Sequence, residues 1–308
     1  MLINEQELKE ALQGMYQGYI GFGISMKEHT TLGIGGRADV FMTPDDPLSM
    51  RNLISLFRKK GVPFITLGRG SNLLVGDNGI DGAVLSLSTF TRIEVLKEGN
   101  SAVELFVEAG VPLQKLVNLC RESGYAGIEG LTGIPGTVGG AICGNAGSYG
   151  CEMKDVVVSV AIMDADGRLE RFKGEGLGFS YRHSSIQKTD VVLSATLRLR
   201  RDEKERVAER TDRFFHEKSM TQPIAERSAG CVFRNPEGNS AGRLIDEAGC
   251  KGMRVGAIEV SPVHANFFVN KGEGTAADYM ALMDQVASTV QARFGIMLEP
   301  EILVAGKV

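Results

Sequence analysis

The sequence predicts a mixed α+β protein with two or three domains. Its 308 residues can supply several hydrophobic cores, because single domains usually hold about 50–200 residues. Residues 46–87 have the pattern of a helix, a strand, a loop and a second strand, which is typical of an α/β unit. Residues 91–111 and 156–172 instead have the pattern of strand hairpins, with turns at 99–100 and 164–167.

Helical patterns extend over much of the remaining chain. Leu8, Ala11, Leu12 and Met15 are spaced as one buried face of a helix over residues 4–16. Further helices are predicted at residues 46–60, 112–123, 200–219, 241–248 and 275–294. The helix at 200–219 carries charges of both signs and is predicted to connect two domains. Strands are predicted at residues 38–44, 62–67, 83–87, 191–200, 265–270 and 298–306.

Composition excludes several classes of protein. The formal net charge is −4, which argues against a nucleic acid or an anionic membrane as the main partner. The five cysteines are odd in number and form no C-x-x-C pair, so neither a disulfide framework nor a metal site is predicted. The sequence shows no signal peptide and no apolar run near the ~18 residues that span a membrane. We therefore expect a cytoplasmic protein.

A glycine-rich stretch runs from Gly130 to Gly147 and contains no charged residue. Seven of its eighteen residues are glycine, which disfavours a long regular helix. Glycine alone is equally typical of a hinge or of tight turns. Because the stretch also encloses apolar residues such as Ile134 and Val138, we interpret it as a backbone cradle for a large cofactor.

Two other glycine motifs precede this stretch. Gly33, Gly35 and Ala38 match G-x-G-x-x-A, but a strand pattern follows them where a dinucleotide-binding motif needs a helix, so we reject that interpretation. The loop GRGSN at residues 68–72 lies at the predicted carboxyl end of a strand, where open α/β sheets bind ligands. Its backbone N–H groups can hold a pyrophosphate, although a simple tight turn is the alternative.

Few residues are marked as catalytic by their spacing. The four histidines fit neither a nucleophile triad nor a metal site, and the DADG segment at 164–167 has the composition of a turn. Cys231 is placed by its neighbours in a tight turn near Arg234; it is either a buried inert thiol or a proton donor. Arg182 and Glu301, taken alone, have the pattern of surface charges.

Seven motifs together are more specific: HTTLGIGGRAD, LGRGSNLL, GIPGTVGGA within the glycine-rich stretch, FSYRHSS, SAGCVFRNP, AGRLIDEAGCKG and LEPE. In this order they closely resemble the UDP-N-acetylenolpyruvoylglucosamine reductase (MurB) family, from about His29 to the C-terminus. The resemblance implies two α/β subdomains forming a FAD-binding fold of the para-cresol methylhydroxylase (PCMH) type, plus a C-terminal α+β substrate domain. It places these at residues 1–88 with a returning strand at 296–308, at 89–203, and at 204–295.

The resemblance also implies roles for individual residues. Arg182, Cys231 and Glu301 match the family's catalytic positions, and Asn235 and Lys218 match positions that face the substrate. The implied contacts to non-covalently bound FAD are Thr31, Gly35, Gly68, Arg69, Gly70, Ser71, Asn72, Gly133, Ile134, Pro135, Gly136, Thr137, Val138 and Gly139. The implied reaction uses NADPH to reduce the enolpyruvyl ether of UDP-N-acetylglucosamine to UDP-N-acetylmuramate in peptidoglycan precursor synthesis.

Two departures from the commonest family pattern stand out. Cys231 occupies a position where serine is the usual proton donor. The segment after Arg182 is too short for an inserted substrate-clamping loop, so the chain resembles the loop-less subclass. Two alternatives stay open: a flavin oxidase of the same FAD-binding fold acting on a sugar or alcohol, and a non-enzymatic binding protein. The oligomeric state is not predicted.

Overall fold

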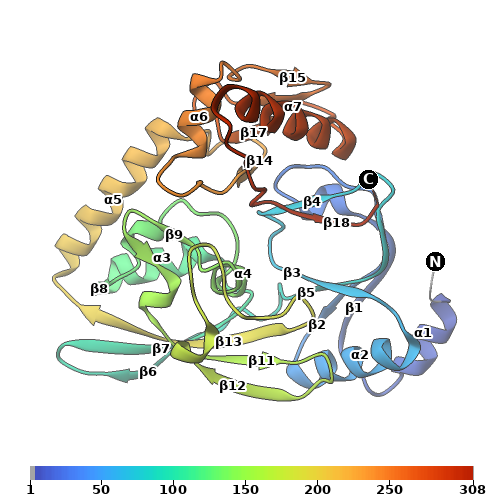
Figure 1. Cartoon of the computed structure of the whole chain (residues 1–308). Helices are drawn as coiled ribbons and strands as arrows, with labels where there is room; N and C mark the ends of the chain where they lie inside the picture. The colour runs from blue at the N-terminus through green and yellow to red at the C-terminus, as the bar shows by residue number, and fades with distance from the viewer. Residues whose placement is uncertain (1–3, 308) are drawn as a thin grey trace. The chain divides into compact units, whose positions relative to one another are not determined.

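The computed structural model describes residues 4–307 (Figure 1). They divide into two compact units. The first unit contains the chain up to Phe22, then Val40–Arg69 and Gly82–Glu217; the second contains Gly23–Asp39, Gly70–Asp81 and the chain from Lys218 onward. The three-part domain division expected from the family resemblance is not tested by this partition and stays a prediction.

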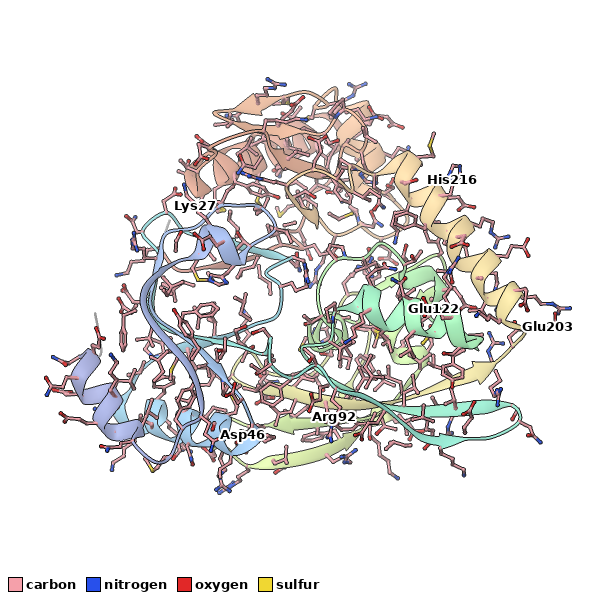
Figure 2. All side chains as sticks on the ribbon, turned by 180° about the vertical axis from the view of Figure 1, so that it is seen from behind. Lys27, Asp46, Arg92, Glu122, Glu203 and His216 are labelled. Atoms are coloured by element: carbon pink, nitrogen blue, oxygen red, sulfur yellow. The ribbon has the colours of Figure 1, made fainter. Side chains whose placement is uncertain are left out.

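Seven α-helices lie within the described residues. They are α1 (Glu5–Leu12), α2 (Pro47–Lys60), α3 (Leu113–Ser123), α4 (Val138–Cys143), α5 (Lys204–Thr221), α6 (Ala241–Glu247) and α7 (Ala276–Phe294). Short 3₁₀ turns cover Met26–His29, Glu129–Leu131, Met153–Asp155 and Gly174–Leu177. The start of α2 follows from its sequence, because the Asp46 carboxylate (labelled in Figure 2) accepts from the Ser49 N–H at 2.8 Å and Pro47 takes the first helical position.

The largest sheet has six antiparallel strands and lies in the first unit, in the order β12-β11-β13-β7-β6, with β8 paired to β13. Its strands are β6 (Ile93–Glu98), β7 (Ala102–Glu108), β8 (Tyr125–Ala126), β11 (Val157–Met163), β12 (Leu169–Lys173) and β13 (Val191–Arg201). The β6–β7 and β11–β12 hairpins were both predicted, and the first is visible as a long projecting ribbon in Figure 1.

A four-stranded sheet has the order β1-β2-β5-β3. Its strands are β1 (Gly18–Ser25), β2 (Arg37–Pro44), β5 (Ile80–Ser86) and β3 (Phe64–Leu67). β3 and β5 are parallel, with Phe64 opposite Ala83 and Leu67 opposite Ser86. The GRGSN loop therefore leaves the carboxyl end of a parallel strand, as the sequence predicted. A small ladder of β9 (Gly147–Ser148) and β10 (Cys151–Glu152) follows α4.

The core of the first unit is built from alternating strand residues and one face of each helix. β7 buries Val103, Leu105 and Val107, while α3 buries Leu116 and Val117. Each such side chain contributes roughly 1.5–3 kcal/mol when it is fully removed from water.

Helix α5 is fastened to the first unit by side chains along most of its length. The Arg210 guanidinium donates to the buried Glu129 carboxylate at 2.7 Å, and the Phe214 ring stacks on Tyr149 with 4.7 Å between ring centroids. Figure 2 labels Glu203, just before the helix, and His216, in its last turns. The charged segment is therefore anchored rather than free-standing.

The second unit has a four-stranded sheet in the order β14-β17-β16-β15 and a parallel pair of β4 with β18. The strands are β14 (Ser228–Cys231), β15 (Arg254–Val255), β16 (Ile258–Val260), β17 (Phe267–Asn270), β4 (Leu73–Val75) and β18 (Leu303–Ala305). Helix α7 begins with the predicted capping box between Thr275 and Asp278, and it buries Tyr279, Leu282 and Val286 in the core of this unit.

Several sequence-based expectations were wrong in detail. The first helix ends at Leu12, so Met15 is 50% exposed and not part of a buried face. Strands β1 and β4 were not predicted: β1 is rich in glycine, which carries a weak strand signal, and β4 has only three residues, which pair with β18 from the end of the chain. The glycine-rich stretch contains the helix α4, because Thr137 supplies a cap and Val138, Ala141 and Ile142 supply a buried face. The last strand covers only Leu303–Ala305.

Candidate active site

The two predicted walls of the cofactor cradle meet in the first unit at Gly68 and Thr137. A Cβ added to Gly68 would lie 2.5 Å from the Thr137 hydroxyl oxygen, so no side chain fits between them. Thr137 is 5% exposed and caps α4 by accepting from the Gly140 N–H at 3.4 Å. Gly68 therefore has to be glycine for the GRGSN loop to approach the start of α4 this closely.

The second wall is a turn followed by α4. The Gly133 N–H donates to the Gln114 side-chain oxygen at 2.8 Å, and the Gly139 N–H donates to the Ala109 carbonyl at 2.8 Å. A Cβ on Gly139 would lie 2.7 Å from the Ala109 Cβ. These two N–H groups are engaged within the protein, so Gly133 and Gly139 contribute close packing to the wall. Of the other predicted contacts here, Ile134 and Gly136 are half-buried, Pro135 is exposed and Val138 is buried.

The last three residues of the GRGSN loop, Gly70 to Asn72, belong to the second unit. Gly70 has a φ of 61° and is buried against the carbonyl of His29, where a Cβ would collide. The Thr31 N–H donates to the Gly70 carbonyl at 3.2 Å, and the Thr31 hydroxyl donates to the Ser228 carbonyl at 2.7 Å. Thr31 therefore acts as a brace for this loop.

The remaining predicted cofactor contacts in this region have different surroundings. Arg69 is exposed and Ser71 is half-buried. Gly35 is buried, and a Cβ there would lie 2.9 Å from the Cβ atoms of Met26 and Val75. The Asn72 amide donates to the Glu301 carbonyl at 3.2 Å, and its own carbonyl accepts from the Leu303 N–H at 3.1 Å. Asn72 thus joins the GRGSN loop to the segment that carries Glu301.

Arg182 lies in a tight turn of the first unit. Ser180 and His183 exchange backbone hydrogen bonds of 3.0 and 3.2 Å, which leaves Tyr181 and Arg182 at the tip. Arg182 has a φ of 52°, a left-handed conformation that costs a non-glycine residue roughly 1–2 kcal/mol. Strain of this kind is often retained at functional sites. Arg182 and Tyr181 line a cavity of about 370 Å³ together with Ser148, Cys151 and Lys154.

A buried asparagine, Asn145, holds the turn that carries Arg182 through a hydrogen bond to Ser180. Its amide nitrogen donates to the Ser180 carbonyl at 2.9 Å and to the Glu152 carboxylate at 3.0 Å, while its oxygen accepts from the Lys154 N–H at 3.0 Å. The hydrogen bond from Lys154 lowers the pKa of Glu152; burial opposes this shift, and Asn145 and the nearby Arg182 add to it. Glu152 is therefore a carboxylate that balances part of the positive charge in the cavity.

The segments that carry Cys231 and Glu301 are hydrogen-bonded to each other in the second unit. The Glu301 N–H donates to the Val232 carbonyl at 2.7 Å, and Phe233 and Pro300 form an isolated β-bridge. The expectation that Cys231 sits in a tight turn was wrong, because it ends strand β14 opposite Phe267, just after an irregularity in the ladder. Cys231 is half-buried, which leaves part of the residue accessible.

Tyr279 of α7 is buried in the core of the second unit, in electrostatic range of Cys231. Burial raises the pKa of its hydroxyl, and the nearby Cys231 adds to that shift. The hydroxyl is fully buried and has no hydrogen-bond partner within residues 4–307. Tyr279 therefore stays protonated near the thiol, and it was missed because its helical spacing predicts only a core residue.

The two predicted substrate residues differ in exposure. Asn235 is exposed, and its side-chain oxygen accepts from the Ala241 N–H at 3.0 Å at the start of α6. Lys218, in the last turn of α5, is only 2% exposed, as a lysine is when its ammonium group is paired. Of the predicted catalytic residues, the second unit holds Cys231 and Glu301, and the first holds Arg182.

Comparison with known proteins identifies the family. Residues 222–305 match the model of the UDP-N-acetylenolpyruvoylglucosamine reductase C-terminal domain, and residues 38–173 match an FAD binding domain. A UDP-N-acetylenolpyruvoylglucosamine reductase of Desulfosudis oleivorans is 39% identical, over 98% of this chain and 100% of the relative. The reductase of Geobacter sulfurreducens is 40% identical over 97% of this chain and 98% of the relative.

The chain belongs to the UDP-N-acetylenolpyruvoylglucosamine reductase family. Its fold agrees, since the crystal structure of the reductase from Thermus caldophilus superposes with a TM-score of 0.80 at 36% identity, covering 94% of this chain and all of that one. The predicted FAD-binding α+β fold is confirmed. Both glycine loops lie in the matched FAD-binding region, and Cys231 and Glu301 lie in the matched C-terminal domain of the reductase family.

The residues present fit FAD on structural grounds. The GRGSN loop follows a parallel strand, and its glycines leave no room for a Cβ at Gly68 or Gly70. The wall that faces it within the first unit, Gly133–Gly139, has no charge to repel a pyrophosphate. A backbone cradle of this kind suits the phosphates of a dinucleotide. Within residues 4–307, no group of three or more acidic, histidine or cysteine side chains is arranged to hold a metal, and no helix is long and apolar enough to cross a membrane.

Sequence reasoning missed the polar side chains that hold this site together. Asn145 and Glu152 flank Arg182, and Asn266 binds the strand that carries Cys231. A weak signal existed for the first two, since NAGSYGCE places an asparagine and a glutamate around two glycines in a segment with no other charged residue. Their partners are distant in sequence, and a single sequence does not reveal such pairs.

Proposed function

We propose that this chain is an NADPH-dependent flavoprotein that reduces UDP-N-acetylglucosamine enolpyruvate to UDP-N-acetylmuramate, a precursor of peptidoglycan. The observation that supports the proposal is the backbone hydrogen bond between Val232 and Glu301, which joins the segments carrying Cys231 and Glu301 in a member of this family. The cytoplasmic location and the preference for NADPH belong to this proposal.

The cofactor is assigned to the two glycine loops. Gly68, Gly70 and the start of α4 supply the backbone surface, and Thr31 and Asn72 hold the GRGSN loop in place through the carbonyls of Gly70, Ser228 and Glu301. The chemistry that FAD supplies when bound is hydride transfer, from NADPH to one carbon of the substrate's double bond. The protein's own task is to orient the substrate and to supply the proton.

Arg182 is proposed to stabilise negative charge on the substrate. Addition of hydride to the vinyl carbon leaves an electron pair on the neighbouring carbon, and this charge delocalises onto the substrate carboxylate. A guanidinium held by a rigid turn can stabilise that charge without reorganising, which is how fixed dipoles and charges lower barriers. The Asn145 hydrogen bond to Ser180 keeps this turn in place.

Cys231 is proposed to donate the proton that completes the reduction. One hydride and one proton then convert the double bond to a single bond, NADPH leaves as NADP⁺, and the thiolate regains its proton from solvent. A thiol is a stronger acid than the serine hydroxyl of most relatives, so the substitution preserves the role. Glu301 is proposed to orient the reacting end of the substrate or to pass the proton onward.

Lys218 and Asn235 are proposed to face the nucleotide-sugar. Asn235 already uses its side-chain oxygen as a cap for Ala241, so its amide N–H groups are the part that can donate to a sugar or phosphate oxygen. Lys218 supplies positive charge in the second unit, where its burial strengthens any interaction with a phosphate.

A flavin oxidase of the same cofactor fold is the alternative. Such enzymes often attach flavin covalently through histidine or cysteine, and GRGSN contains neither. A non-enzymatic binding protein would not need Arg182, Cys231 and Glu301 together.

Purification and anaerobic turnover distinguish these possibilities. We expect a yellow protein that releases FAD on denaturation, loses its visible flavin absorption when NADPH is added, and regains it when the enolpyruvyl substrate is added. Mass spectrometry of the product should show a gain of two hydrogens. A protein that holds no FAD after reconstitution, or one that NADPH does not reduce, would refute the proposal. Reoxidation by oxygen but not by the substrate would favour the oxidase.

A further inference from the structure

Asn266, which directly precedes strand β17, holds two consecutive residues of the Cys231 segment. It is 2% exposed. Its side-chain oxygen accepts from the Phe233 N–H at 2.9 Å, and its amide nitrogen donates to the Phe233 carbonyl at 2.7 Å. Its backbone carbonyl accepts from the Val232 N–H at 2.8 Å. The side-chain amide therefore acts as one more backbone unit of the ladder.

This contact lies where the regular ladder stops. Strand β14 pairs with β17 at Ser228 opposite Val269 and at Cys231 opposite Phe267, with an irregularity between the two positions. An irregularity of this kind leaves a residue unpaired and locally disrupts the ladder. Asn266 resumes the pairing immediately after Cys231, so the thiol-bearing residue is held from both sides.

The residues that Asn266 holds also carry the Glu301 segment. The Val232 carbonyl accepts from the Glu301 N–H at 2.7 Å, and Phe233 bridges Pro300. The next residue continues the contact, because the Arg234 N–H donates to the Glu299 carbonyl at 2.8 Å. The buried Asn266 amide is therefore hydrogen-bonded to the same backbone segment that pairs with the Glu301 segment and follows Cys231.

We propose that Asn266 is a positioning residue that sets the geometry of Cys231 relative to Glu301 during proton transfer. The proposal rests on the proposed reductase function. Asn266 touches neither side chain, so it acts through Val232 and Phe233. Misplacement of a reacting group by about 1 Å can cost about 10²-fold in rate, and loss of this amide removes two hydrogen bonds from the backbone that carries Cys231.

Asn270 offers a matched control on the same strand. It is 4% exposed, donates to the Leu32 carbonyl at 2.9 Å and accepts from the Gly274 N–H at 3.0 Å. Its side-chain oxygen also accepts from the Gly272 N–H at 3.2 Å. Asn270 is therefore a buried amide that both donates and accepts, as Asn266 does, but these side-chain hydrogen bonds do not involve residues 231–233.

The test compares Asn266→Ala, Asn266→Asp and Asn270→Ala in FAD-loaded protein by anaerobic rapid mixing. We expect both Asn266 variants to bind FAD, and NADPH to reduce them at the wild-type rate. Reoxidation by the enolpyruvyl substrate should slow by about 10²-fold in Asn266→Ala, with kcat lowered and KM little changed. Asn266→Asp keeps the acceptor for Phe233 and should also slow reoxidation. Asn270→Ala should reoxidise at the wild-type rate.

Each other outcome has a defined meaning. Wild-type reoxidation in a folded Asn266→Ala protein would overturn the proposal, as would an equal loss in Asn270→Ala. Failure of both Asn266 variants to retain FAD would also overturn it, because Asn266 would then be needed for folding rather than for positioning. A wild-type enzyme that NADPH reduces but the substrate does not reoxidise would refute the proposed function itself, and this proposal with it.

Discussion

The backbone N–H of Glu301 donates to the carbonyl of Val232, with 2.7 Å between nitrogen and oxygen. Val232 follows Cys231 directly, so the two proposed acidic groups are attached to segments that are hydrogen-bonded to each other. The spacing of the two backbone segments is therefore fixed by a main-chain hydrogen bond, and it does not depend on the conformation of either side chain. Substitutions of either side chain should consequently affect chemistry more than folding.

Glu301→Gln should separate these two effects. The backbone bond to Val232 does not use the side chain, so we expect the free energy of unfolding to change by no more than about 0.5 kcal/mol. Product formation should fall by at least about 10²-fold, the usual contribution of an acid or base. Urea unfolding and steady-state turnover measure the two. Glu299→Gln, at an exposed neighbour, should leave both unchanged; full turnover by Glu301→Gln would remove Glu301 from the mechanism.

Gly139 and Gly140 are adjacent in α4, but we expect substitution by alanine to change the stability of the protein in opposite directions at the two positions. A Cβ on Gly139 would lie 2.7 Å from the Ala109 Cβ, whereas the nearest atom to a Cβ on Gly140 is 3.7 Å away. Gly139→Ala should destabilise the protein by about 1–3 kcal/mol through overpacking. Gly140→Ala should be neutral or stabilising by up to about 1 kcal/mol, because alanine restricts the unfolded chain. Thermal unfolding of both variants checks this, and destabilisation of equal size in the two would contradict the close approach described here.

Arg182 allows backbone strain to be measured separately from charge. Its φ of 52° suits glycine and disfavours alanine, while both substitutions remove the guanidinium. We expect Arg182→Gly to be more stable than Arg182→Ala by about 1–2 kcal/mol, and both to lose product formation. Denaturant unfolding gives the difference. A more stable alanine variant would mean that this turn does not hold residue 182 in a left-handed conformation.

The low pKa of Glu152 predicts a pH dependence of stability. Because hydrogen bonding from Lys154, and also from Asn145, favours the ionised form in the folded protein, Glu152 contributes stability above its unfolded pKa of about 4.3. That contribution is lost as the pH falls from there through the folded value. The free energy of unfolding of the wild type should therefore exceed that of Glu152→Gln at neutral pH, and the difference should shrink on acidification. A difference that stays constant with pH would contradict the network around Arg182.

Local sequence signals were enough to predict much of the fold. The sequence predicted the capped helix α2, the hairpins β6–β7 and β11–β12, and the capping box of α7. Each of these features depends on residues that lie close together in the sequence. Strand β4 was missed, since its three residues pair with β18 from the far end of the sequence. Helix α4 was missed because glycine density outweighed the cap at Thr137 in the prediction.

The site was predicted only in part, because residues with distant partners carry no local sequence signal. Motif resemblance pointed to Arg182, Cys231 and Glu301 and to the two glycine loops. The amides that hold these residues in place, Asn145 and Asn266, form their decisive contacts with Ser180 and Phe233, which lie more than thirty positions away. Contacts between such distant residues follow from the fold and have no signature in a single sequence.

The most direct test of the account is the reoxidation of NADPH-reduced Cys231→Ala enzyme by UDP-N-acetylglucosamine enolpyruvate, with Cys231→Ser as the conservative variant. NADPH should reduce both variants as it reduces the wild type, because hydride transfer does not need the thiol. We expect Cys231→Ala to remain reduced in the presence of the substrate, and Cys231→Ser to reoxidise at a lower but measurable rate. Reoxidation of Cys231→Ala at the wild-type rate, with normal product, would contradict the assignment of Cys231 as proton donor.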